Sequence, residues 1–274
     1  MHLTMSLSLI IGSGWKKQNG GVMRELHLFA GAGGGILGGM LLGHTTVCAV
    51  EIEPYCRRVL LQRQRDGILP KFPIWDDVCT FDGKPWKGMV DVICGGFPCQ
   101  DISSAGGGAG ISGARSGLWK EMSRIIGEIQ PRFAFVENSP LLVGRGLAVV
   151  LADLAELGYD ARWGVLGANH VGAIHHRTRL WLVAYPRSVG KARWNGSGLE
   201  ISQIIQRRAH SKVSWEDLDQ SQFAGKRYKD MPKPLLAGME DDVAYKLDRI
   251  KFIGNGQVPR VAATAFRLLA ESVK

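Results

Sequence analysis

A regular alternation of short apolar runs and helix-like stretches, from Arg24 to about Tyr185, constrains the fold of this chain more than any other feature. Such apolar runs are typical of buried parallel strands, and the stretches between them are typical of helices that cross over a sheet. The expected strands are Glu25–Phe29, Thr46–Val50, Val90–Cys94, Phe133–Val136 and Arg179–Tyr185. The expected helices are one that ends at Leu42, then Pro54–Arg65, Gly117–Ile129, Leu147–Leu157 and Val258–Val273. This order predicts an α/β fold with a doubly wound sheet whose ligands lie at the carboxyl ends of the strands.

The alternation stops after Pro186, and this change divides the chain into parts. Residues 187–236 are polar and rich in Lys, Arg, Gln and Ser, with a few isolated aromatics. We expect a small separate lobe here, with a disordered insertion as the alternative. Residues 1–22 are expected to be a poorly ordered extension, or else translation begins at Met23. The expected division is therefore an extension, a main domain, a lobe and a return to the main domain, over 1–22, 23–186, 187–240 and 241–274.

Composition excludes several classes of protein. A hydrophobic content of 45% with 22% charged residues, over 274 residues, is typical of a globular protein with one large domain or two modest ones. The five cysteines form no C-x-x-C pair, so we expect a reducing cytosolic compartment and neither a metal site nor a disulfide framework. No apolar run is long enough to cross a bilayer, and the start lacks the basic leader of a secretory signal. The net charge of +9 favours a polyanionic partner such as nucleic acid.

A glycine-rich turn follows the first expected strand, in the segment Phe29-Ala-Gly-Ala-Gly-Gly-Gly. Glycines let a backbone turn tightly and approach a ligand closely, and this turn opens a helix, where a nucleotide-like cofactor meets a parallel sheet. Glu51 ends the second strand, where its carboxylate can accept hydrogen bonds from ribose hydroxyls. A nicotinamide cofactor stays an alternative, because G-x-G-x-x-G is also satisfied, by Gly33, Gly35 and Gly38.

The most informative stretch is Val90-Asp-Val-Ile-Cys-Gly-Gly-Phe-Pro-Cys-Gln. An apolar strand ends in two glycines, and Pro98 then presents Cys99 at the carboxyl edge of the sheet. A nucleophilic thiol needs such exposure, because the thiolate is the reactive species and deep burial raises the pKa. Cys94 lies within the apolar strand and is expected to be a core residue. Taken alone, Cys99 fits a catalytic nucleophile and an inert loop cysteine equally well.

Charged residues are expected at the same edge. Asp76-Asp77-Val78 follows an apolar segment, and its carboxylates could meet the exocyclic amine of an adenine or cap a helix. Glu137, in Phe135-Val-Glu-Asn-Ser-Pro, ends another strand, where burial would let it protonate a ring nitrogen. Arg177 and Arg179 enter the next strand two residues apart and so are expected on one face. Their planar donors suit a carbonyl oxygen or a phosphate, although such arginines more often form surface salt bridges.

Five segments, in this order and spacing, resemble the DNA (cytosine-5)-methyltransferase family: Phe29-x-Gly-x-Gly-Gly, Gly96-Phe-Pro-Cys-Gln, Glu137-Asn, Arg177-x-Arg179 and Gly254-Asn-Gly-Gln-Val-Pro. The resemblance covers residues 24–185 and about 245–272, and the polar lobe lies where this family keeps its target recognition domain. The chain departs from the family at His175, where Gln is usual. The helical motif that usually precedes the last segment is not recognisable.

The resemblance implies a Rossmann-like domain, S-adenosylmethionine as cofactor, double-stranded DNA as substrate, and residues 101–116 as a mobile loop. It implies a cofactor pocket made of Phe29, Gly31, Gly33, Gly34, Glu51, Ile52, Asp77, Val78, Pro98, Leu118 and Asn255. The catalytic residues that it implies are Cys99, Glu137, Arg177 and Arg179. A monomer in the cytoplasm of a bacterium or a phage-infected host is expected, and a restriction endonuclease partner is compatible with the family.

The mechanism that the resemblance implies begins with a cytosine flipped out of the duplex. Cys99 adds to C6, Glu137 holds a proton at N3, and Arg179, supported by Arg177, stabilises charge at O2. Carbon 5 then takes the methyl group, and loss of its proton and of Cys99 restores the ring.

Three alternatives stay open. An RNA cytosine methyltransferase has the same architecture, but that branch tends to have Pro-Pro-Cys where this chain has Phe97-Pro-Cys. A nicotinamide-dependent oxidoreductase would leave the Pro-Cys turn and Glu137-Asn138 without a role. A catalytically silent DNA-binding protein would have no need of Cys99, Glu137 and the paired arginines.

Overall fold

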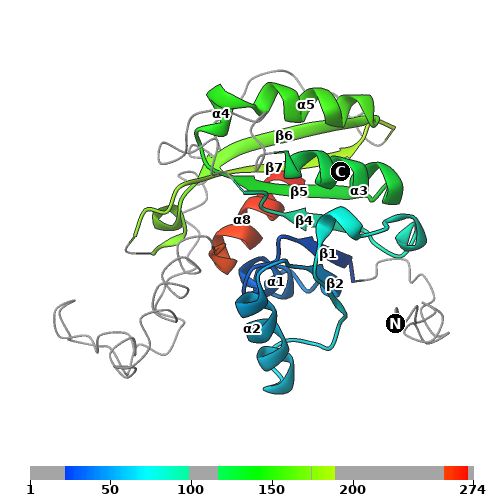
Figure 1. Cartoon of the computed structure of the whole chain (residues 1–274). Coiled ribbons are helices and arrows are strands. Elements are labelled where there is room, and N and C mark those ends of the chain that lie inside the picture. Colours follow the sequence, from blue (N-terminus) through cyan, green and yellow to red (C-terminus); the bar gives the residue numbers. More distant parts are fainter. Residues whose placement is uncertain (1–21, 99–116, 174, 189–255, 271–274) are drawn as a thin grey trace.

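The computed structural model of the chain describes residues 22–98, 117–173, 175–188 and 256–270. Its strands are β1 Arg24–Leu28, β2 Thr45–Val50, β3 Ile74–Trp75, β4 Val92–Gly95, β5 Phe133–Asn138, β6 Tyr159–Leu166 and β7 Arg179–Pro186. Within the described residues they form one seven-stranded sheet in the order β3-β2-β1-β4-β5-β7-β6 (Figure 1). The predicted α/β, doubly wound architecture is therefore confirmed. The chain starts in the middle of the sheet at β1, runs outward to β3 and returns to β4, which places a switch point between β1 and β4.

One strand direction and two strands, β3 and β6, escaped prediction. β1 to β5 are parallel to one another, whereas β7 is antiparallel to both β5 and β6. β6 was not predicted, because its sequence YDARWGVL mixes charged and small residues with apolar ones and contains no continuous apolar run. Its Trp163 is exposed, as befits a strand at the edge of a sheet.

Apart from the short helix α4, which was not predicted, the helices agree with the predicted ones to within a few residues. They are α1 Gly34–Leu41, α2 Pro54–Arg65, α3 Leu118–Ile129, α4 Leu142–Arg145, α5 Leu147–Glu156 and α8 Pro259–Ala270, with 3-10 turns η2 Val78–Thr80, η3 Lys84–Trp86 and η5 Ala168–Val171. Pro54 opens α2, where its missing N–H costs no hydrogen bond. The expected end of the last helix at Val273 lies outside the described residues.

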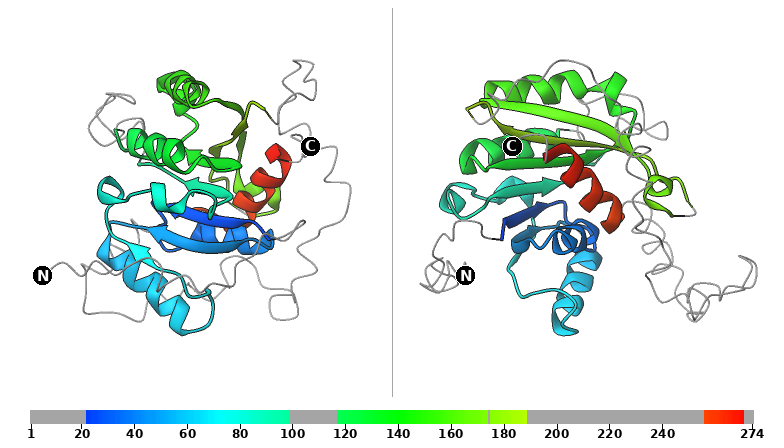
Figure 2. Two further views of the ribbon diagram at one scale, coloured as in Figure 1. Left: turned by 90° about the vertical axis from the view of Figure 1, so that its right-hand side faces the viewer. Right: turned by 180° about the vertical axis from the view of Figure 1, so that it is seen from behind.

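Alternating side chains of the strands feed two cores, one on each face of the sheet. On one face, Leu26 and Leu28 of β1 pack with α3 and α5, which bury Trp119, Met122 and other apolar residues. On the other face, α1 and α8 cover the sheet, and Phe266 of α8 packs on aromatic residues of β5 (Figure 2). The sheet is thus buried on both sides, as a largely parallel sheet requires.

The close approach of α8 to α1 depends on a glycine. An added Cβ at Gly38 would lie 3.0 Å from the Cβ of Ala262 and 3.0 Å from the main-chain oxygen of Pro259. This contact brings the start of α8, and the segment Gly256–Val258 before it, to the carboxyl edge of the sheet. No helix in the described part of the chain is long and apolar enough to span a membrane.

Candidate active site at the carboxyl edge of the sheet

Three strands position the polar residues of the site. β4 ends at Gly95 and leads to Pro98, and β5 ends with Glu137 and Asn138. Because β7 is antiparallel, its first residues lie beside the last residues of β5, with Leu180 opposite Asn138. Residues far apart in the sequence therefore meet at one edge. Cys99, which directly follows Pro98, lies outside the described residues, as does Asn255.

Glu137 and Arg179 form an ion pair at this edge. The distance between Arg179 Nε and Glu137 Oε1 is 2.9 Å, and Glu137 is 8% exposed. Arg177 has a positive φ of 28° and precedes β7, so the expectation that both arginines lie on one strand face is wrong. The guanidinium group of Arg177 instead donates to the main-chain oxygen of Gly256, and its charge still acts on Glu137.

Burial gives Glu137 the character of a proton-holding group. Burial raises the pKa of Glu137, while the charges of Arg179 and Arg177 and hydrogen bonds from Gln257 and Arg179 act in the opposite direction. The net effect is a pKa above the ordinary value of a glutamate. A carboxyl group with a raised pKa is suited to hold or donate a proton near neutral pH.

Asn138, next to the catalytic candidate, fixes the segment that leads to Cys99. Its buried amide Nδ2 donates to the main-chain oxygen of Phe97 at 3.0 Å, and its Oδ1 accepts from Ser139 N at 2.7 Å. Phe97 is itself buried against Trp119. The backbone before the nucleophile candidate is therefore anchored by one hydrogen bond and by one apolar contact.

Cys94, in contrast to Cys99, was predicted to be a core residue. It is buried, and burial holds the pKa of its thiol well above the ordinary value, so the predicted core role is confirmed.

The glycine turn is closed by the predicted ribose carboxylate. Glu51 Oε2 accepts from the N–H of Gly31 at 2.6 Å, and Oε1 accepts from the N–H of Glu53 at 2.8 Å. Phe29 and Gly31 both have φ of 54°, and an added Cβ at Gly31 would meet nothing within 4 Å. The turn thus presents backbone toward open space on that side, whereas a Cβ at Gly33 would lie 2.9 Å from Leu60.

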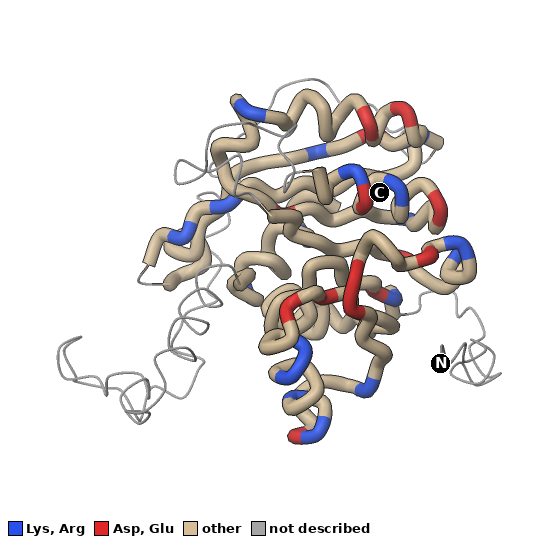
Figure 3. Tube along the Cα trace, in the orientation of Figure 1, with Lys and Arg blue, Asp and Glu red and all other residues tan. Residues whose placement is uncertain are grey.

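The other predicted cofactor residues lie around the ends of β2 and β3. Ile52 is 68% exposed and directly follows Glu51, so its apolar side chain is free to cover a ligand. Asp77 accepts from the N–H of Cys79 at 2.9 Å and so caps η2, as one of the two interpretations expected. Val78 is buried in the core, and Leu118 is half-buried at the start of α3. In Figure 3 the acidic positions of this region gather beside α2, whose charged residues are all arginines.

A cavity joins the glycine turn to Glu137. Its volume is about 380 Å³, which includes space open to solvent. Of the predicted site residues, it brings together Phe29, Gly31 and Glu137, whereas Gly33, Glu51, Ile52, Asp77, Val78 and Leu118 are not part of its lining. The lining residues that sequence reasoning did not single out include His27, Gly96 and Gln257. In the sequence, only the two glycine-containing motifs around Gly96 and Gln257 indicated that these residues lie near the site.

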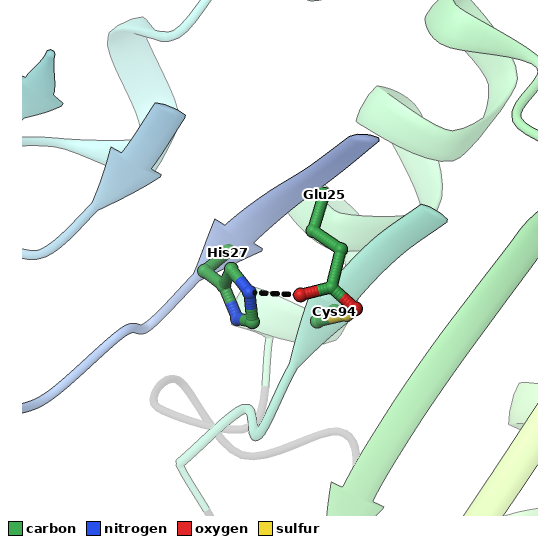
Figure 4. Close-up of side chains that lie close together, drawn as sticks. All are labelled: Glu25, His27 and Cys94. Atoms are coloured by element: carbon green, nitrogen blue, oxygen red, sulfur yellow. Dashed lines mark hydrogen bonds and ion pairs between the residues drawn. The ribbon is translucent and has the colours of Figure 1, made fainter. Parts of the chain in front are cut away.

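A buried polar cluster lies behind this cavity. Glu25 and His27 of β1 face Cys94 of the neighbouring β4 (Figure 4). A carboxylate oxygen of Glu25, a ring nitrogen of His27 and Sγ of Cys94 lie within 4.8 Å of one another. Glu25 Oε2 is 2.9 Å from His27 Nε2, and Oε1 is 2.7 Å from His44 Nδ1. The Cys94 thiol also hydrogen-bonds to Glu25. Burial raises the pKa of Glu25, but the two histidines outweigh it and lower the pKa to about 2. The carboxylate is therefore held ionised by the groups around it.

Sequence comparison assigns this chain to a family. The family model of C-5 cytosine-specific DNA methylases matches residues 23–246. The chain belongs to this family, which confirms the resemblance found in its motifs.

Individual relatives agree with that assignment. The chain is 34% identical over 170 residues to the type II methyltransferase M2.BsuMI of Bacillus subtilis, which covers 59% of this chain and 42% of that protein. It is 30% identical over 227 residues to the type II methyltransferase M.CviJI of Paramecium bursaria Chlorella virus IL3A, which covers 81% and 58%. The chain thus spans about half the length of the curated relatives that it matches.

Solved structures share the fold. A DNA modification methyltransferase encoded within an Escherichia coli prophage matches with a TM-score of 0.51 and 25% identity, over 61% of this chain and 47% of that one. The Dnmt2 methyltransferase of S. pombe matches with a TM-score of 0.53 and 19% identity, over 70% and 56%.

Proposed function

We propose that this chain transfers a methyl group from S-adenosylmethionine to carbon 5 of a cytosine that is flipped out of a short, specific duplex DNA sequence. The observation that carries the proposal is the buried Glu137, which is paired with Arg179 and lines the same cavity as a glycine turn with an open backbone face. An acid with a raised pKa and a fixed cation, side by side, match the N3 and O2 positions of a cytosine ring.

The residues of the turn fit the cofactor. Gly31 leaves room for a ligand, and the Glu51 carboxylate lies at the end of β2, where it has lone pairs left for ribose hydroxyls. Ile52 is exposed where an adenine ring would need an apolar surface. Gly33, Gly34, Asp77, Val78, Pro98, Leu118 and Asn255 complete the proposed pocket on the strength of the family motifs alone. When bound, S-adenosylmethionine supplies an electrophilic methyl group.

The chain's own residues make carbon 5 reactive in this proposal. The Cys99 thiolate forms a bond to C6 while Glu137 holds a proton at N3, so electron density shifts to C5. Arg179 stabilises the charge at O2, and Arg177 holds the C-terminal segment in place through Gly256. After methyl transfer, a base such as water takes the proton from C5, and the electron pair of that C–H bond forms the C5–C6 double bond. The bond between Cys99 Sγ and C6 breaks with its electron pair on sulfur, which restores the aromatic ring.

The substrate must leave the duplex, because neither C5 nor C6 is accessible to this buried edge inside a stack of bases. We propose residues 187–240 as the lobe that reads the DNA sequence and residues 241–274 as the return to the catalytic domain. The net charge of +9 favours phosphate contacts for such a complex.

The nicotinamide alternative loses its main support. The glycines that satisfy G-x-G-x-x-G have other neighbours: a Cβ at Gly35 would lie 2.6 Å from Gln257 Oε1, and one at Gly38 would touch Ala262. Packing of the C-terminal segment therefore explains these two glycines without a dinucleotide.

Bisulfite sequencing of DNA from cells that express the protein tests the proposal. We expect protected cytosines within one short recurrent sequence, and none in cells that express Cys99→Ser. Methylation of transfer RNA with no methylation of duplex DNA would support the RNA methyltransferase alternative instead.

A further inference from the structure

Gln257 reaches into the catalytic edge from the far end of the chain. It precedes α8, which packs on the same face of the sheet as α1 (Figure 2), and its side chain donates a hydrogen bond to Glu137. It lines the cavity together with Glu137 and Gly96. The neighbouring Gly256 accepts from Arg177, so the segment contacts both Arg177 and Glu137.

Three glycines make room for this side chain. An added Cβ at Gly34 would lie 2.2 Å from the main-chain oxygen of Gln257, and one at Gly35 would lie 2.6 Å from its Oε1. A Cβ at Gly96 would lie 2.4 Å from Glu137 Oε2 and 3.3 Å from Gln257 Nε2. The amide and the carboxyl group therefore meet directly over Gly96, and no larger residue fits at any of the three positions without displacing them.

We propose that Gln257 is a positioning residue for Glu137, which holds its second carboxyl oxygen while Arg179 holds the first. Arg179 Nε contacts Oε1 at 2.9 Å, and the added-Cβ distances at Gly96 place the Gln257 amide on the side of Oε2. Two partners on two oxygens fix the plane of the carboxyl group. The C-terminal segment is thus one wall of the catalytic site as well as an anchor of the fold.

An amide suits this position because it can serve both protonation states of an acid. Its NH₂ donates to a carboxylate, and after a half-turn its oxygen accepts from a carboxylic acid. Glu137 can therefore gain and lose a proton without losing its partner. A carboxylate at this position would repel Glu137, and an apolar side chain would leave Oε2 without a partner.

Other groups near Glu137 also influence its pKa, besides Gln257. Among the described residues, the charged groups that face it are Arg179 and Arg177, while His27 of β1 and Cys94 of β4 line the same cavity. Because the Gln257 hydrogen bond lowers the pKa of Glu137, its removal should raise that pKa. The role of Glu137 in catalysis rests on the proposed function, whereas its titration does not.

The test is a carboxyl ¹³C NMR titration of glutamate-labelled protein, with the Glu137 signal assigned by its loss in Glu137→Gln. In Gln257→Met, which keeps a linear side chain but no N–H donor, the midpoint for Glu137 should rise by roughly half a unit to one unit. Gln257→Glu, in which charge repulsion acts in the same direction, serves as a second variant if the methionine variant does not fold. Val258→Ala, which removes packing from the same segment without touching Glu137, should leave the midpoint where it is.

Kinetics gives an independent readout in the full chain. Activity that needs the protonated carboxyl falls as pH rises through the pKa of Glu137, so the alkaline limb of the kcat profile should move to higher pH in Gln257→Met. We expect kcat at the optimum to fall on the order of 10-fold, with little change in KM for DNA.

An unmoved Glu137 midpoint in a folded Gln257 variant overturns the inference, even if the enzyme is active. A midpoint that moves in a protein that methylates no cytosine overturns the proposed function and leaves the inference standing.

Discussion

At the scale of single residues, the buried carboxylate of Glu25 is the clearest case of a charge that the fold has to accommodate. It is 2% exposed, and it accepts hydrogen bonds from His27 and His44. An added Cβ at Gly39 would lie 1.9 Å from Glu25 Oε2, so α1 can pass over the carboxylate only because a glycine stands there. A buried charge without such partners would cost several kcal/mol, on the order of what a whole domain has to spare.

This environment predicts a defined pH dependence of stability. The pKa of Glu25 is lowered from 4.5 to about 2, so its contribution to stability is present above pH 4.5 and is lost as pH falls toward 2. Glu25→Gln should lower the free energy of unfolding at pH 6 by on the order of 3 kcal/mol, and the difference from wild type should shrink as pH falls. Urea unfolding at several pH values measures this.

The matched control is Glu156→Gln, at an exposed carboxylate near the end of α5, which should change little at any pH. A Glu25→Gln protein that is destabilised equally at pH 6 and pH 2.5 would mean that the charge of Glu25 is not what the histidines stabilise.

At the scale of elements, the glycine turn faces open space on one side and packs against the C-terminal segment on the other. Gly31 faces open space and leaves room for a ligand, whereas Gly34 and Gly35 lie against Gln257. The sequence motif predicted the turn and its position after β1 correctly, and its assignment of Gly34 to a cofactor stays a prediction. The contact with Gln257 could not be predicted, because the two residues lie more than two hundred positions apart in the chain.

Gly34→Ala tests the packing of the turn against Gln257. Its Cβ would lie 2.2 Å from a main-chain oxygen, which cannot rotate away, so the segment before α8 must shift. We expect a loss of about 2 kcal/mol or more in the free energy of unfolding, since a forced overlap in a packed region costs ~1–3 kcal/mol. Gly144→Ala in α4, where a Cβ would meet nothing within 4 Å, should be neutral or slightly stabilising. Thermal unfolding of both variants measures the difference, and equal Tm values would contradict the packing account.

The elements also show where sequence patterns stop being informative. Continuous apolar runs located β1, β2, β4, β5 and β7, because strands buried on both faces need such residues. β6 has one face toward solvent and was missed. The direction of β7 is not encoded in its own residues. It follows from pairing with β5 and β6, and it is what brings Arg179 to Glu137.

At the scale of the whole molecule, the last described helix packs back onto the sheet domain. α8 returns to α1 and to the sheet face after a long excursion of the chain, and Gly256 and Gln257 meet Arg177 and Glu137. Parts on either side of the proposed recognition lobe therefore build one site.

The central claim is that Cys99 forms a covalent bond with a flipped cytosine, and a duplex that carries 5-fluorocytosine at the target tests it most directly. Fluorine at C5 blocks the loss that normally releases the enzyme, so wild-type protein with S-adenosylmethionine should form a complex that survives denaturing electrophoresis. Cys99→Ser should form none, while Cys79→Ser, at an exposed cysteine in the same protein, should form it as wild type does. Wild-type protein that methylates ordinary DNA but never traps the fluorinated duplex would contradict the account.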